Sequence, residues 1–253
     1  MKPEPIICFI IFLYGIIIGS FLNVCIYRIP LKKNIVTTPS HCTQCGYRLQ
    51  WYELIPIMSY LFLRGRCRKC GSKISIQYPI IEGLNGVLYV WVFLIHGLTP
   101  VSVIYCLCVS ALIVMSVIDF RTYMIPAGIN IFLGIAGIIR VLYDFENYMD
   151  YIIGSVGVSG FLLLIYIITR GKGIGGGDIK LMAVIGLILG WKYNILAFVL
   201  GCILGSVIHL IRMRVSKKDR VLAFGPYLSA GIMIAILYGK PITDWYIGLY
   251  ISG

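Results

Sequence analysis

Long apolar runs with few charged residues recur along the whole chain, and they limit what it can fold into. A transmembrane helix needs about 17 to 25 mostly apolar residues. Runs near this length lie at 5–27, 79–97, 101–118, 125–142, 151–169, 179–190, 194–211 and 224–239. Hydrophobic residues make up 59% of the 253 residues, more than a soluble domain of this size can bury. The sequence therefore predicts an all-α polytopic membrane protein with about eight transmembrane helices.

Three details of this span pattern are less regular. The first run is too long for the apolar core of a signal peptide and has no cleavage site after it, so we interpret it as a retained span. Gly190 to Asn194 is either a tight external turn between two spans or an interruption in one long helix. The tail after Lys240 carries Trp245 and Tyr246, aromatic residues that favour the membrane interface.

The basic residues predict the orientation of the spans. Alternating the spans from an external N-terminus places most Lys and Arg residues on one side, including those of 28–73 and the run Arg212 to Arg220. That side is expected to be cytoplasmic, and the run to anchor the chain there. Topology and anionic lipid headgroups then account for the net charge of +12. No nucleic-acid partner is expected, because no separate basic soluble domain exists.

Residues 28–78 form the one long polar loop, and its cysteines predict a zinc site. Cys42 and Cys45 form one Cys-x-x-Cys pair, and Cys67 and Cys70 form a second. Four thiolates complete a closed tetrahedral site, so the zinc is expected to be structural. The alternatives are disulfides or free thiols, and a reducing cytoplasm disfavours disulfides.

The remaining histidine and cysteine residues have simpler interpretations. His41 adjoins the first pair and is an alternative ligand, although a solvated loop histidine accounts for it. The other cysteines lie in apolar spans and are interpreted as small buried hydrophobic residues; they are Cys8, Cys25, Cys106, Cys108 and Cys202.

Glu82, Asp119 and Asp178 lie within or at the ends of predicted spans. A carboxyl group at membrane depth is costly and indicates a functional site. Asp119 ends the third span and Asp178 opens the sixth, so both are expected at the cytoplasmic face. Two carboxyl groups meeting there can share a proton, and such a pair activates water for peptide hydrolysis. The glycines at 175–177 leave room for another helix or a substrate backbone beside Asp178.

The residues alone also allow non-catalytic roles for these acids. Asp178 is suited to cap a helix, and Asp119 could pair with Arg121 or Lys180. A proton-coupled transporter would use intramembrane acids as well, but it predicts an internal repeat and acids near the midplane. A membrane scaffold whose zinc loop binds a partner is a further alternative.

Six motifs occur together in this chain. They are GSFLNVCIYRIP at 19–30, the two Cys-x-x-Cys pairs, ISIQYPIIEGLNG at 74–86, DFRTYMIP at 119–126, GGGDIKL at 175–181 and FGPYLSAG at 224–231. In this order they resemble the type IV prepilin peptidases, also called leader peptidase/N-methyltransferases. The resemblance spans residues 19 to 231, nearly the whole chain.

The resemblance implies an aspartic protease of the G-x-G-D class in the bacterial inner membrane. Such an enzyme cleaves the basic leader from type IV prepilins and pseudopilins at the cytoplasmic face. By motif position, Asp119 and Asp178 correspond to the catalytic pair, and Gly175 and Gly177 to the glycines of G-x-G-D.

Many members also methylate the new N-terminal amine with S-adenosylmethionine, and the long zinc-bearing loop is similar to that bifunctional form. The resemblance divides the chain into a first span at 1–27, a zinc-binding loop with a role in methyl transfer at 28–78, and a transmembrane peptidase domain at 79–253. A peptidase without methyl transfer stays an alternative.

The residues for the second activity are less defined. Gln77 stands where the family commonly has arginine, and no glycine-rich nucleotide loop is present. Gly19, Asn23 and Glu82 are our candidates for binding the substrate or the methyl donor. Gly19 and Asn23 share a helix face, so helix packing explains them equally well. Glu82 could instead pair with a loop arginine.

Overall fold

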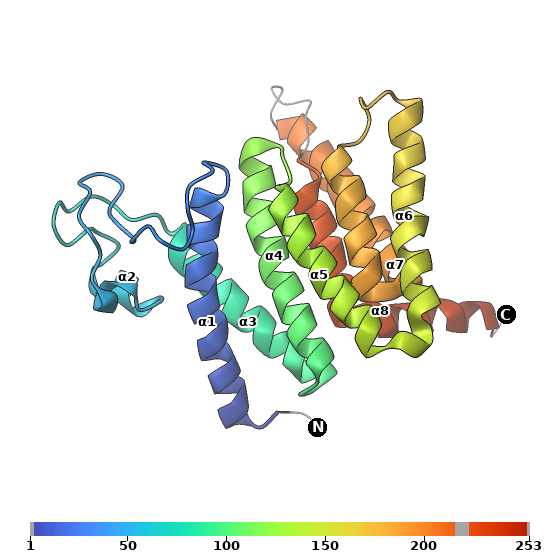
Figure 1. Cartoon of the computed structure of the whole chain (residues 1–253), viewed down its shortest axis with the longest axis horizontal. Helices are drawn as coiled ribbons and strands as arrows, with labels where there is room; N and C mark the ends of the chain where they lie inside the picture. Colours follow the sequence, from blue (N-terminus) through green and yellow to red (C-terminus); the bar gives the residue numbers. More distant parts are fainter. Residues whose placement is uncertain (1–2, 216–222, 252–253) are drawn as a thin grey trace. The chain divides into compact units, whose positions relative to one another are not determined.

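The computed structural model describes residues 3–215 and 223–251, and the described chain is built from helices (Figure 1). In chain order they are α1 (Pro5–Arg28), η1 (Trp51–Leu54), α2 (Met58–Phe62), α3 (Gln77–His96), α4 (Pro100–Thr122), α5 (Ala127–Tyr143), η2 (Phe145–Asn147), α6 (Tyr148–Ile168), α7 (Gly176–Val215) and α8 (Gly225–Ile251). The all-helical prediction is confirmed for this part of the chain.

Several helices meet the requirements for crossing a membrane. Among the described residues, the helical segments α1, α3, α4, Phe145–Ile168 and Gly176–Arg214 are long and apolar enough, while α5 is apolar but shorter. Large apolar side chains are exposed on their outer faces, as lipid contact requires. The chain is therefore a multi-pass membrane protein, and the count of eight spans stays a prediction.

Gly190 divides α7 into two limbs. Its φ of 75° and ψ of 175° are not helical. In a straight helix the backbones of residues 182 and 194 would lie about 18 Å apart. The side chain of Asn194 nevertheless donates to Met182 O at 3.1 Å. The chain must therefore reverse at Gly190, which favours the tight turn over an interruption in one long helix.

The chain forms two compact units, residues 1–114 and 115–253. In the first, α1 packs directly on α3, because a Cβ on Gly15 would lie 2.6 Å from Gly86 Cα. Asn85 then donates to Gly15 O at 2.7 Å and accepts from the Ser110 hydroxyl at 2.9 Å. This buried hydrogen-bonded chain ties α1, α3 and the first part of α4 together.

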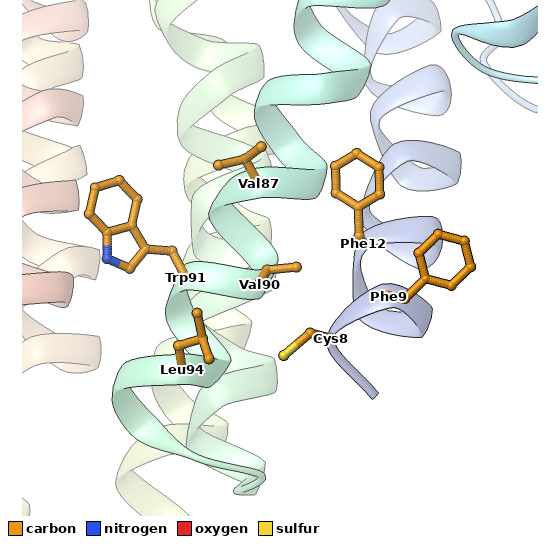
Figure 2. Close-up of a pocket in the computed structure, with 7 residues that line it drawn as sticks. All are labelled: Cys8, Phe9, Phe12, Val87, Val90, Trp91 and Leu94. Carbon is orange, nitrogen blue, oxygen red and sulfur yellow. The ribbon is translucent and has the colours of Figure 1, made fainter. Parts of the chain in front are cut away.

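An apolar groove lies between α1 and α3, towards the N-terminus of α1 (Figure 2). Its lining is almost entirely apolar and contains no carboxyl group; the residues are Cys8, Phe9, Phe12, Val87, Val90, Trp91 and Leu94. A groove of this character suits a lipid chain and offers no group for catalysis.

The second unit is held together by glycine contacts between α6, α7 and α8. A Cβ on Gly154 would lie 2.6 Å from Gly190 C, and one on Gly231 would lie 2.7 Å from Gly201 N. Small residues let helix backbones approach closely in a membrane. The two limbs of α7 therefore pack against α6 and α8.

The ends of the second unit bear on two predictions. Pro241 lies inside α8, and the last part of the helix turns aside in Figure 1, so an interfacial tail stays a prediction. Of the predicted basic anchor, Arg212 and Arg214 are described, and its remaining basic residues, Lys217, Lys218 and Arg220, lie outside the described residues.

Candidate functional site

Asp119 lies in the last turn of α4, where its side chain is buried at 5% exposure. Its Oδ2 accepts a hydrogen bond from the peptide N–H of Gly225 at 2.9 Å. Gly225 is the first residue of α8, and the N–H groups of a helix's first turn have no partner within the helix. The start of α8 is therefore fixed against this carboxyl group.

Only glycine fits at position 225 without a shift. A Cβ there would lie 2.7 Å from Asp119 Oδ2 and 3.1 Å from its Cγ. Pro226 has no N–H, and the N–H groups of Tyr227 and Leu228 donate to Phe224 O. The first turn of α8 thus has one N–H for Asp119 and pairs the others internally.

Asp178 lies in the first turn of α7 and is also buried, at 8% exposure. Asp119 lies near enough to interact electrostatically with the carboxyl group of Asp178, so the structure places the two predicted acids in one site. The site belongs entirely to the second unit.

The two G-x-G-D glycines have different neighbours. A Cβ on Gly175 would lie 3.1 Å from Asp178 Oδ2, so Gly175 leaves space beside the carboxyl group. A Cβ on Gly177 would lie 3.0 Å from the Cβ of Ile125, in the connection between α4 and α5. Gly177 therefore lets that connection approach α7 near the acids.

Gly225 is the residue of this site that sequence reasoning missed. The sequence predicted a span at 224–239, and α8 begins at Gly225. It gave no sign that the glycine N–H would face Asp119. The signal that could have found it was the position of Gly225 in FGPYLSAG, one of the six motifs.

The four predicted cysteines form a cluster on two nearly identical turns. Gly46 N–H donates to Cys42 O and Gly71 N–H donates to Cys67 O, both at 2.9 Å. The glycines have φ of 71° and 70°, in the left-handed region that favours glycine. Each Cys-x-x-Cys segment therefore curls its two sulfurs toward one point.

The sulfurs have the spacing of a four-thiolate metal site. The Sγ atoms of the cluster all lie within 4.8 Å of one another, and Cys42 and Cys70 are 3.9 Å apart. Sulfurs bound at about 2.3 Å to one tetrahedral zinc would be about 3.8 Å apart. Peptide N–H groups of Cys45 and Gln44 lower the pKa of Cys42 to about 6, whereas the pKa of Cys45 in the same cluster is raised to about 11.

His41 is not part of this cluster. Its side chain is exposed, and Nδ1 lies 3.2 Å from Pro39 O. The interpretation as a solvated loop histidine fits these contacts.

Gly19, Asn23 and Glu82 are brought together, but by packing contacts. A Cβ on Gly19 would lie 2.7 Å from Glu82 Cα, and Asn23 accepts from the side chain of Gln77 at 3.3 Å. Glu82 accepts from the peptide N–H of Ile57 at 2.7 Å, where a loop arginine was an expected partner. These contacts tie α1, α3 and the loop together, and the candidate role of the three residues stays a prediction.

The fold and the site together define a helical, multi-pass membrane protein with a buried carboxyl pair and a separate four-cysteine cluster. Two family models match the chain: the Bacterial Peptidase A24 N-terminal domain over residues 13–96 and the Type IV leader peptidase family over residues 106–210. The chain belongs to the type IV leader peptidase family, and the predicted resemblance is confirmed.

Curated relatives agree along most of their length. The chain is 35% identical to a prepilin leader peptidase/N-methyltransferase of Bacillus subtilis (strain 168), covering 94% of this chain and 97% of the relative. Proteins of the same name from Aeromonas hydrophila and Pseudomonas putida are each 31% identical, over 94% and 90% of this chain and 93% and 89% of their own lengths. No solved structure matches the chain.

Proposed function

We propose that this chain cleaves the basic leader peptide from type IV prepilins or pseudopilins and methylates the N-terminal residue that cleavage exposes. The names of its relatives support both activities. The observation that carries the peptidase assignment is the pair of buried carboxyl groups, Asp119 and Asp178, on separate helices. A pair of buried acids that interact supports this assignment, because aspartic peptidases use two neighbouring carboxyl groups.

The pair supplies acid and base in the same reaction. With one proton shared between the two acids, the ionised carboxylate removes a proton from a water molecule. The water oxygen attacks the carbonyl carbon of the scissile peptide at the same time. The protonated carboxyl group then gives its proton to the leaving nitrogen, and the C–N bond breaks. Gly175 leaves space beside Asp178 for an extended substrate backbone. A helical substrate must unwind first, because its carbonyl is hydrogen-bonded internally.

The substrate is a protein whose apolar N-terminal helix enters the bilayer while its basic leader stays in water. By alternation of the spans, the end of α4 and the start of α7 lie on the side of the basic loop. The positive-inside rule makes that side cytoplasmic. We place the protein in the bacterial inner membrane, with the cysteine cluster and the acids at its cytoplasmic face.

The four-cysteine cluster is proposed to hold a structural Zn²⁺. Four thiolates fill a tetrahedral coordination sphere and leave no position for water or substrate. The ion would hold the two Cys-x-x-Cys turns together within the loop. It has no proposed part in peptide cleavage.

Methyl transfer is proposed on the names of the relatives. S-adenosylmethionine is the expected donor and supplies an electrophilic methyl group when bound. Gly19, Asn23 and Glu82 stay our candidates for its site, and they also contact one another, Ile57 and Gln77. A peptidase without methyl transfer stays the second candidate function.

Co-expression with a prepilin and mass spectrometry of the product tests both activities. Asp119→Asn and Asp178→Asn are each expected to abolish leader removal while the protein remains folded and inserted. Asp150→Asn is the matched control, because Asp150 is an exposed aspartate of the same unit and its variant should cleave normally. Cleavage by either dyad variant would remove that residue from catalysis, whereas absence of cleavage by the wild type would favour the transporter or scaffold alternatives. An added methyl group on the wild-type product would show a peptidase with methyl transfer, and its absence would indicate a peptidase without it.

A further inference from the structure

An uncharged run interrupts the basic loop. Residues 54–63 read LIPIMSYLFL and contain no charged side chain, whereas basic residues lie on either side of them. Apolar segments of about this length are too short to span a bilayer, and they are typical of buried, interfacial or re-entrant segments. The run is not a buried segment, because its side chains are exposed within residues 1–114.

Three large apolar side chains of this run point outward. Phe62 is 80% exposed, Leu61 62% and Met58 48%. Trp51, just before the run, is 77% exposed. A contiguous group of this kind in water would be costly, and such groups mark contact with a membrane or a partner.

The contacts of Ile57 place this run at the depth of the helices. Its N–H donates to Glu82 at 2.7 Å, and a Cβ on Gly83 would lie 3.9 Å from its Cδ1. Glu82 is five residues inside α3, or about 8 Å from its start. Gly19, which packs on Glu82, is about 13 Å from the end of α1. In Figure 1, α2 lies level with the middle of α1, not beyond its end.

Peptide N–H groups of the run have hydrogen-bond partners within the protein. Peptide N–H groups of Ser59, Leu61 and Leu63 donate to main-chain carbonyls, and that of Ile57 donates to Glu82. Backbone groups at membrane depth need partners within the protein. Ile57 itself has φ of 59°, a strained value for a β-branched residue, and the Glu82 hydrogen bond holds it there.

The residues beside the run suit the edge of a bilayer. Trp51 and Tyr52 precede it, and aromatic residues favour the interface. Arg64 and Arg66 follow it, and their side chains can reach anionic headgroups. The nearby acid Glu53 has a side chain only 1% exposed and pairs with Arg68 at 2.8 Å, so it presents no negative charge to lipid.

We propose that residues 54–63 are embedded in the lipid leaflet from which the loop emerges, with acyl chains as the partner of Met58, Leu61 and Phe62. The loop then has two parts, a cysteine cluster in water and an apolar segment in the membrane. The inference depends on the membrane location of α1 and α3, and it does not depend on the reaction proposed above.

Site-directed spin labelling in lipid nanodiscs tests this placement. Phe62 and, separately, Val36 are replaced by p-acetylphenylalanine, which takes a nitroxide label without touching the cysteines. Val36 is the matched control, because it is an apolar residue of the same loop, 84% exposed, outside the run. Power saturation then compares collisions with oxygen, which enters lipid, and with a water-soluble nickel chelate.

The label at 62 is expected to be several times more accessible to oxygen than to the chelate, and the label at 36 is expected to show the reverse. Equal access of the chelate to both positions would put the run in water and overturn the proposal. Protection of position 62 from both reagents would mean that protein covers it, which also overturns the proposal. Met58 is a second labelling position if the variant at 62 is not recovered.

Discussion

Replacing Gly225 by alanine is expected to disable peptide cleavage while the protein stays folded. The new methyl carbon would lie 2.7 Å from Asp119 Oδ2 and 3.1 Å from its Cγ. Ordinary contacts begin near 3.4 Å, so the carboxyl group or the start of α8 must move by about 0.7 Å. The same movement weakens the 2.9 Å hydrogen bond from Gly225 N–H to Asp119.

Both effects lower the rate in the same direction. A displacement of about 1 Å in a reacting group can cost about 100-fold. A hydrogen bond to a charged group contributes about 1.5–3 kcal/mol, which corresponds to about 10- to 160-fold at 1.36 kcal/mol per tenfold. We therefore expect kcat/KM for leader cleavage to fall about 100-fold. KM should change little, because the apolar part of the substrate does not depend on this contact.

The assay is cleavage of a purified prepilin by the detergent-solubilised enzyme, with thermal unfolding measured on the same preparations. Two glycines of α8 serve as controls. No described atom lies within 4 Å of the Cβ that alanine would add at Gly248, so Gly248→Ala should resemble the wild type. A Cβ on Gly231 would lie 2.7 Å from Gly201 N, about 9 Å along α8 from Gly225. Gly231→Ala should therefore lower thermal stability with no selective loss of activity per folded molecule.

Two results would refute this reasoning. The first is a Gly225→Ala variant that retains kcat/KM within about threefold of the wild type, which would show that the contact with Asp119 is unnecessary. The second is a loss of activity only in proportion to folded protein, as expected for Gly231→Ala, which would make Gly225 a packing residue alone.

Three further predictions concern other parts of the chain. Cys42→Ser should reduce bound zinc, measured by atomic absorption, and lower the unfolding temperature of the loop, whereas Ser72→Ala beside the cluster should retain the metal. Glu82→Ala leaves the N–H of Ile57 without its acceptor at a cost of about 1–3 kcal/mol, so limited proteolysis should cut the loop faster; an unchanged cutting rate would contradict this role. Hydrogen bonds from Tyr151 and Asn147 lower the pKa of Asp144 below 3.8, so its stabilising effect is present above that pH and is lost as the pH falls through the lowered value. Asp144→Asn should therefore be less stable than the wild type at neutral pH, and melting curves against pH should show the difference shrinking on acidification.

The cysteine cluster was predictable because its geometry is local. Each Cys-x-x-Cys-Gly segment closes its own turn, as the hydrogen bonds from Gly46 to Cys42 and from Gly71 to Cys67 show. Only the meeting of the two turns requires the intervening chain. The roles of Gly19 and Glu82 were harder to predict, since the same residue types suit both a ligand site and helix packing, and only their contacts distinguish the two.

The apolar runs by themselves determined that this chain is a helical membrane protein, because burying so many hydrophobic residues is favourable in lipid whatever their exact order. They also determined that Asp119 and Asp178 lie at span ends, since charge is costly deeper in the bilayer. Only the tertiary structure decided that Gly225 faces Asp119, that Ile57 reaches Glu82 and that the chain reverses at Gly190. These contacts join segments far apart in the sequence or depend on one backbone conformation, and packing between whole helices sets them, so no short stretch of sequence encodes them.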